Sequence, residues 1–280
     1  MIRVLSFFFA VILLMPAVTF AESDRTLTLD GNFIQGGLVV GRVDPGAAVE
    51  FDGRKLRVSP EGDFLFGFGR DAPPAAKLTV RMPDGYVHLQ EIAVQQRKYD
   101  VQKIDGLPPK KVTPPDDPEL MAKLKEERRK TAVARKLDLP EPGFLSGWIW
   151  PAEGRISGVF GSQRILNGKP KNPHSGVDVA GPEGTPIVAP ADGEIVLAEP
   201  DMYFNGSMVF IDHGHGLKTA YLHMSRIDVK IGQKVKRGEQ IGAIGATGRV
   251  TGPHLHWMMY WFDTKLDPAW VVPERPGSRG

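Results

Sequence analysis

The most restrictive feature of this chain is the regular return of turn-forming residues between short apolar runs. The 280 residues include 32 glycines and 24 prolines, without any collagen-like period. In the first third of the sequence the turn signals are Asp44-Pro45-Gly46, Phe51-Asp52-Gly53, Pro60-Glu61-Gly62 and Pro83-Asp84-Gly85. Glycine accepts positive φ, and proline pre-sets φ for the first turn position. Short runs at this spacing predict a small β-sandwich between Leu27 and about Gln96.

The sandwich pattern resembles the bacterial immunoglobulin-like modules that accompany many cell-wall enzymes. We therefore assign residues 22–104 to an N-terminal immunoglobulin-like β domain. The resemblance is one of strand and turn spacing, and no single motif in this region carries it.

The first 21 residues have the composition of a secretory signal peptide. A basic Met1-Ile2-Arg3 precedes an apolar stretch from Val4 to Phe20, and Ala21 is a small residue before the polar Glu22. We expect cleavage after Ala21, with an uncleaved membrane anchor as the alternative. The mature protein is then expected to be secreted and not to insert stably in a membrane.

Composition excludes several classes of function. The formal net charge is only +2, which gives no case for nucleic acid as a partner. The chain has no cysteine, so disulfide bonds and thiol chemistry are excluded.

Residues 105–146 are predicted to be a proline-rich linker followed by a charged helix. The segment from Leu107 to Pro115 contains four prolines, which remove backbone donors and restrict the residues before them. Asp117-Pro118-Glu119 then supplies an N-cap, a proline at the first helical position and an early carboxylate, so a helix should run to about Lys136. Its charges alternate in sign, which favours a solvated helix over a patch that adheres to an anionic wall.

The remaining residues, 147–280, again read as strands and turns. The clearest hairpin-like pieces are 184–196 and 235–245, and no amphipathic helix interrupts them. We expect a mainly antiparallel β domain here, and a mainly β fold for the chain as a whole.

Histidines concentrate in this C-terminal part and point to a metal site. In an extended strand His254 and His256 project to the same face, roughly 7 Å apart. His174 and Asp178 share a face if their segment is extended, and His223 follows a strand-like run. Two nitrogens and one carboxylate oxygen are the ligands expected of a catalytic zinc that keeps an open position for water. Spacing alone leaves open whether His254 or His256 is the ligand.

The motifs His-x-x-x-Asp, Tyr-x-His and His-x-His, in this order between about Trp150 and Pro268, resemble those of the M23 zinc metallopeptidases. These are the lysostaphin-like or LytM-type peptidoglycan endopeptidases. The resemblance implies that a zinc ion is bound by three residues and that two histidines assist catalysis. The implied ligands are His174, Asp178 and His256, and the implied catalytic residues are His223 and His254.

The resemblance further implies hydrolysis of peptide cross-links in peptidoglycan by zinc-activated water. The expected setting is the periplasm of a Gram-negative bacterium, and the expected bond joins D-alanine to a diamino acid. Peptidoglycan peptide stems are thus the expected partner, with cell-wall or divisome proteins as further candidates. Cleavage as an LD-endopeptidase or a carboxypeptidase is left open by the sequence.

Three further histidines lie outside these motifs. His88 is expected to be structural, and His213 and His215 are expected to be hairpin-turn residues near the site that do not bind the metal directly. The competing functions are a non-catalytic wall-binding regulator or activator of amidases and a lipoyl- or biotinyl-like carrier domain. The carrier interpretation lacks a modifiable lysine at a hairpin tip.

Overall fold

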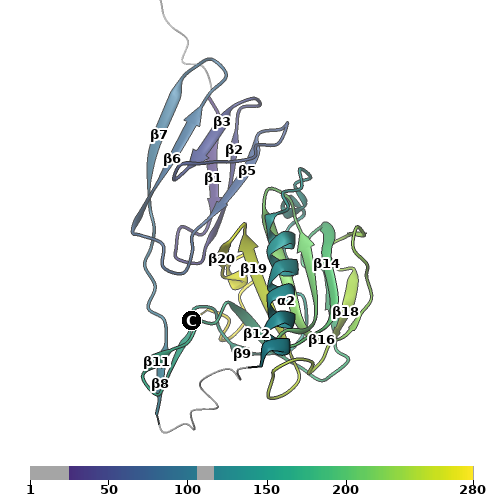
Figure 1. Ribbon diagram of the computed structural model, residues 1–280. Helices are drawn as coiled ribbons and strands as arrows, with labels where there is room; N and C mark the ends of the chain where they lie inside the picture. The colour runs from purple at the N-terminus through teal and green to yellow at the C-terminus, as the bar shows by residue number, and fades with distance from the viewer. Residues whose placement is uncertain (1–24, 106–116, 280) are drawn as a thin grey trace, which may run out of the picture.

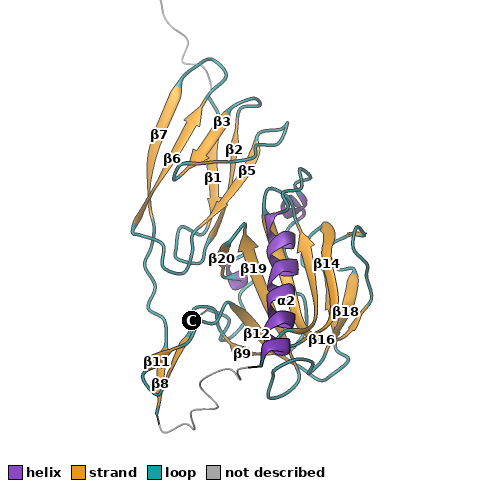
Figure 2. Ribbon diagram, in the orientation of Figure 1, coloured by secondary structure: helices purple, strands orange, loops and turns teal. Residues whose placement is uncertain are grey.

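The computed structural model describes residues 25–105 and 117–279, which form two β-rich parts with one long helix (Figure 1). The expected signal peptide and most of the proline-rich linker lie outside these ranges. Coloured by secondary structure, strands dominate both parts (Figure 2). The prediction of a mainly β chain with antiparallel sheets is confirmed. Within residues 25–105 and 117–279 no helix is both long and apolar enough to cross a membrane.

The N-terminal part consists of two antiparallel sheets packed face to face. One sheet has the order β1-β2-β5 and the other β4-β3-β6-β7. The strands are β1 (Leu27–Gly31), β2 (Leu38–Val43), β3 (Ala48–Phe51), β4 (Arg54–Lys55), β5 (Asp63–Gly67), β6 (Ala75–Arg81) and β7 (Val87–Ala93). Phe51 of one sheet stacks on Phe66 of the other, with ring centroids 4.3 Å apart. The immunoglobulin-like character of this sandwich stays a prediction.

A small sheet joins the two parts of the chain. Strand β8 (Val101–Ile104) pairs in parallel with β10 (Gln163–Leu166), which pairs with β11 (Lys169–Pro170). The chain that leaves the sandwich is therefore held against the C-terminal part.

The C-terminal part is built on one ten-stranded sheet. Seven of its strands follow the order β17-β14-β15-β16-β19-β12-β9. The other three branch from this path: β18 pairs with β16 and β13, and β20 pairs with β19. The bounds are β9 (Arg155–Gly158), β12 (Gly176–Ala180), β13 (Pro186–Val188), β14 (Gly193–Met202), β15 (Gly206–Asp212), β16 (Leu217–Ile227), β17 (Lys234–Val235), β18 (Gln240–Ile244), β19 (His254–Trp261) and β20 (Thr264–Leu266). Along β19 the odd-numbered side chains enter the apolar core, Leu255 and Trp257 among them. The even-numbered side chains face the opposite side, because strand side chains alternate.

Helix α2 (Pro118–Lys136) lies on this opposite side, across the sheet (Figure 1). Its N-cap is Asp117, which accepts hydrogen bonds from the backbone N–H groups of Glu119 and Leu120, as the sequence predicts. Most of the helix is exposed, but Ala134 is buried in a cluster with methionines and aromatic residues of β14, β15 and β19. Two short 3-10 helices, Gly143–Ser146 and Pro268–Trp270, complete the described elements.

The two parts share one apolar cluster and a buried ion pair. Trp261 of β19 lies 6.0 Å, centroid to centroid, from Phe51 of the sandwich. Arg97 and Asp267, 4% and 1% exposed, form an ion pair of 2.8 Å across the same junction. The sandwich is thus packed on the core side of β19, which leaves the even-numbered face free to carry a site.

Candidate metal centre

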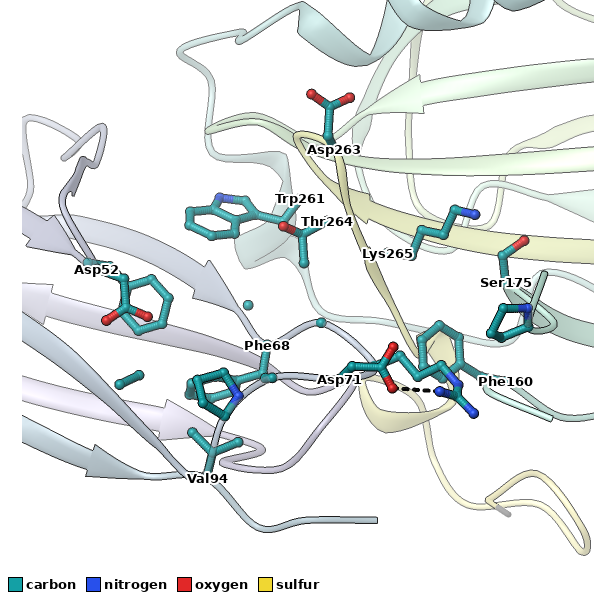
Figure 3. Close-up of a pocket in the computed structure, with 18 of the residues that line it drawn as sticks. Asp52, Phe68, Asp71, Val94, Phe160, Ser175, Trp261, Asp263, Thr264 and Lys265 are labelled. Carbon is teal, nitrogen blue, oxygen red and sulfur yellow. Dashed lines mark hydrogen bonds and ion pairs between the residues drawn. The ribbon is translucent and has the colours of Figure 1, made fainter. Parts of the chain in front are cut away.

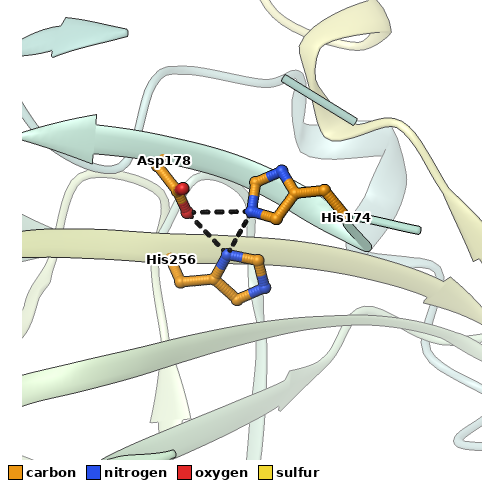
Figure 4. Close-up of side chains that lie close together, drawn as sticks. All are labelled: His174, Asp178 and His256. Carbon is orange, nitrogen blue, oxygen red and sulfur yellow. Dashed lines mark hydrogen bonds and ion pairs between the residues drawn. The ribbon is translucent and has the colours of Figure 1, made fainter. Parts of the chain in front are cut away.

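Strand register brings the first two candidate ligands together. In the antiparallel pair of β12 and β19, Asp178 lies directly opposite His256, and Ala180 lies opposite His254. Directly opposite residues project to the same face of a sheet. The Oδ1 atom of Asp178 is 2.7 Å from Nδ1 of His256 and 3.9 Å from Nε2 of His254 (Figure 4 shows Asp178 and His256).

The third candidate, His174, comes from the loop before β12 and not from the strand itself. Its N–H donates to the carbonyl of Ser162, and its own carbonyl accepts from Gly161. This pairing turns the ring over Asp178. Nε2 of His174 lies 3.1 Å from Oδ1 of Asp178 and 3.1 Å from Nδ1 of His256.

Gly158 of β9 is a supporting residue that sequence reasoning missed. It pairs with Asp178 in the sheet. A Cβ at position 158 would lie 2.4 Å from Oδ2 of Asp178 and 3.1 Å from Cε1 of His174. Only a residue without a side chain lets both groups approach, and no motif in the sequence marks this position.

Three of the histidine rings are oriented by backbone carbonyls. Nδ1 of His174 is 2.9 Å from the carbonyl oxygen of Val159, Nδ1 of His223 is 2.9 Å from that of Thr247, and Nδ1 of His254 is 2.9 Å from that of Gly252. A carbonyl only accepts, so when these rings are neutral each Nδ1 carries the proton and each Nε2 presents its lone pair. Carbonyls of this kind fix the tautomer of metal-binding histidines.

His223 has an unusual backbone conformation at a point where β16 changes its pairing partner. The strand pairs with β19 up to Leu222 and with β18 from Met224, and His223 lies at this change of partner with φ 65°. Residues other than glycine rarely adopt such a conformation, and it concentrates at functional sites. The ring of His223 lies 4.9 Å from that of His254, centroid to centroid.

The protonation states suit metal binding. Burial by itself would raise the pKa of Asp178, but hydrogen bonds with His174 and His256 outweigh burial and hold that pKa well below its ordinary value. Burial lowers the pKa of His256, and it lowers the pKa of His223 to about 4. The carboxylate is therefore ionised and both imidazoles are neutral near pH 7, the forms in which these groups bind metals or accept protons.

The three candidate ligands fit a zinc ion. Their donor atoms all lie within 4.8 Å of one another. Two imidazole nitrogens and one carboxylate oxygen are a donor set found at catalytic zinc sites, which keep a further position for water or substrate. The structure thus brings together all five of the residues expected from the sequence: His174, Asp178, His223, His254 and His256.

These five residues line a cavity of about 500 Å³ on the even-numbered face of β19. Its wall includes Thr131 and Arg135 of helix α2, and Asn205 and Arg249 from loops. None of these four stands in a recognisable motif, so their place beside the metal centre was not predicted. Helix α2 is consequently part of the wall of the site as well as a connection between the two parts.

The other two C-terminal histidines lie in a hairpin turn, as expected, but do not line the cavity of the metal centre, so the prediction that they lie near the site is wrong. His213 donates from Nδ1 to the carbonyl of Asp192 and accepts at Nε2 from the hydroxyl of Thr219, each at 2.7 Å. His215 contacts the carbonyl of Pro140 at 3.2 Å. Both belong to the turn between β15 and β16.

Comparison with known proteins agrees with this geometry. A family model described as Peptidase family M23 matches residues 172–268. The peptidoglycan DD-endopeptidase ShyA of Vibrio cholerae is 49% identical over 104 residues, covering 37% of this chain and 24% of ShyA. The cell division protein DipM of Caulobacter vibrioides is 39% identical over 132 residues, covering 45% of this chain and 21% of DipM. The murein hydrolase activator NlpD of Escherichia coli is 31% identical over 131 residues, covering 47% of this chain and 32% of NlpD. The matched regions therefore span a third or less of these relatives.

A solved structure is similar over most of its length. The crystal structure of a protein assigned to peptidase M23 from Pseudomonas aeruginosa is 32% identical, with a TM-score of 0.65. The match covers 85% of this chain and 94% of that one, so it includes the N-terminal part as well as the metal centre.

Proposed function

This chain belongs to peptidase family M23, and from that membership we propose that it is a zinc-dependent hydrolase of peptide cross-links in peptidoglycan. The observation that carries the proposal is the convergence of His174, Asp178 and His256 beside two further histidines with free Nε2 atoms.

His174, Asp178 and His256 are the proposed zinc ligands. They donate through Nε2, Oδ1 and Nδ1, the three atoms that already point to a common centre. When bound, zinc lowers the pKa of a coordinated water to about 7 and polarises a carbonyl. The carboxylate of Asp178 balances part of the positive charge.

His223 and His254 are the proposed catalytic residues. With the proton held at Nδ1 by a backbone carbonyl, each ring presents Nε2 to the cavity and can accept a proton there from water. Once protonated, the same Nε2–H can donate to the developing oxyanion or return the proton to the leaving amine. The hydrogen bond from Nδ1 of His223 to the carbonyl of Thr247 keeps the ring in place through this cycle.

The proposed substrate is the cross-linked peptide stem. The support is the DD-endopeptidase activity that the name of ShyA states, together with 49% identity over 104 residues. We propose the bond between D-alanine and a diamino acid, and a periplasmic location. Both depend on this chain acting as ShyA does.

The test uses the protein without residues 1–21 and isolated sacculi. We expect release of peptide fragments whose masses identify the bond, loss of release with a chelator, and recovery on adding zinc. His254→Ala should retain zinc and release nothing, whereas His256→Ala should lose zinc as well. Full hydrolysis by a His256→Ala protein that holds no zinc would refute the proposal.

A second candidate is a non-catalytic activator of wall hydrolases. It is favoured by the 31% identity to NlpD, a murein hydrolase activator by name, and would imply cell-wall or divisome proteins as partners. The complete donor set favours the hydrolase, because an activator does not need one. A cellular function that persists undiminished in His254→Ala would favour the activator.

A further inference from the structure

A second cavity, of about 580 Å³, lies between the sandwich and the C-terminal part (Figure 3). It has walls from both, and it shares His174 and Ser175 with the cavity of the metal centre. The proposed zinc ligand His174 therefore stands where the two cavities meet. A peptide bound at the metal can extend from one cavity into the other.

Strand register places Lys265, a lysine that lines this second cavity, on the metal-binding face of the sheet. In the pairing of β19 with β20, Lys265 lies directly opposite Tyr260. Tyr260 is four residues beyond His256 on β19, so the two project to the same face, about 13 Å apart at the rise of an extended strand. Lys265 shares that face because directly opposite residues do.

The two arginines that line this second cavity, Arg54 and Arg70, are already engaged. Arg70 donates from Nε to the carbonyl of Gly161 at 2.9 Å and pairs with Asp71 at 2.5 Å. Arg54 lies over the ring of Phe262 at 4.5 Å, measured to the centroid.

Lys265 has no such partner. It is only partly exposed to solvent, and it makes no ion pair anywhere in residues 25–105 and 117–279. Figure 3 shows its ammonium group extending toward the side of the cavity on which Ser175 is drawn. An unpaired ammonium in a cavity is available to a ligand.

Arg135 of helix α2 adds a second positive charge beside Lys265. Its guanidinium lies 5.5 Å from the ring centroid of Tyr260, the residue opposite Lys265. It forms an ion pair with the exposed Asp263, at a long 3.5 Å from Nε. The two cations are close enough that Arg135 contributes, after burial, to lowering the pKa of Lys265.

We propose that Lys265 and Arg135 form a binding site for a carboxylate of the peptide substrate, three to four residues from the bond that is cleaved. The spacing follows from the 13 Å along β19, since an extended peptide advances about 3.3 Å per residue. Peptidoglycan stems carry free carboxylates, and this site selects stems in which a carboxylate stands at that distance. The inference rests on the proposed function for the identity of the peptide.

The experiment compares two probes with the zinc-loaded chain lacking residues 1–21. One is a purified cross-linked stem-peptide dimer with free carboxylates, and the other is the same dimer with its carboxylates converted to carboxamides. A hydrogen bond to a charged group contributes enough for the free dimer to have a KM about tenfold lower, with kcat unchanged. Lys265→Gln should abolish this preference, and Lys265→Arg should restore most of it.

The matched control is Lys230→Gln, which removes an exposed lysine that lines neither cavity and should behave as the unmodified protein. An unchanged ratio of KM values in Lys265→Gln would overturn the inference. If Lys265 only stabilised the fold, Lys265→Gln would change the stability of the protein and leave the ratio of the two KM values unchanged.

Binding separates this inference from the proposed function. Calorimetry with His254→Ala measures the affinity for both dimers without turnover. A carboxylate preference that disappears in the double variant with Lys265→Gln supports the site even if the unmodified protein cleaves nothing. Equal affinity for the two dimers overturns the site even if the protein cleaves both.

Discussion

Gly158 and Asp178 face each other across β9 and β12 so closely that a methyl group on Gly158 would lie 2.4 Å from the Oδ2 atom of Asp178. Gly158→Ala should therefore displace the carboxylate and lower zinc occupancy in the purified protein, with activity reduced at least tenfold. Metal analysis and hydrolysis of sacculi measure the two effects. Gly69→Ala adds the same methyl group with its nearest contact at 3.5 Å and should keep its zinc. Equal zinc content in the two variants would contradict the prediction.

Zinc should stabilise the folded chain, because the ligand atoms converge only in the folded state. A ligand at 100 times its dissociation constant adds about 2.7 kcal/mol to the free energy of unfolding. Removing the metal with a chelator should thus lower Tm by several degrees, and adding zinc back should restore it. His256→Ala should have the low Tm with or without zinc. A chelator that leaves the Tm of the unmodified protein unchanged would count against the site.

His213 should make the protein less stable in mild acid. Burial lowers its pKa to about 4 in the folded chain, whereas an exposed histidine has a pKa of about 6.5. Between these values the unfolded chain binds the proton and the folded chain does not, so the free energy of unfolding falls as pH drops from 6.5 to 4. The full effect of one such group is about 3 kcal/mol. Urea unfolding at several pH values should show this slope reduced in His213→Gln, and an identical slope in both proteins would refute the assignment.

Arg97 and Asp267 should hold the junction of the two parts together. Both side chains are buried, and burial raises the pKa of Asp267 in spite of the neighbouring guanidinium. Arg97→Ala would leave a buried carboxylate without its cation, which costs about 3–5 kcal/mol. Thermal or urea unfolding should show the loss. Arg129→Ala is the matched control, since its pair with Glu126 is exposed on both sides and contributes little.

Local features of the fold could be predicted because they depend on residues that are close together in the sequence. Asp117 and Pro118 mark the start of helix α2, and glycine and proline turns mark the strands of the sandwich. The two-residue spacing of His254 and His256 is enough to place both on one face. The five residues of the site were also expected, through motifs that resemble those of the M23 family.

The geometry of the site was decided by tertiary structure. Asp178 lies opposite His256 only because two strands nearly 80 residues apart pair in one register, and a shift of one residue would turn these side chains to opposite faces. The positive φ of His223 comes from the change of partner along β16. Neither register nor a change of partner has a local signal in the sequence.

The same division applies to Lys265 and Gly158. By sequence, Lys265 is one lysine among many, and Gly158 is one of 32 glycines. The first gains its position from pairing with Tyr260 and the second from pairing with Asp178. The sequence by itself determined the strands, the helix and the set of metal-binding residue types, because these depend on neighbours along the chain. Only the tertiary structure decided which side chains meet, because that depends on how distant strands align.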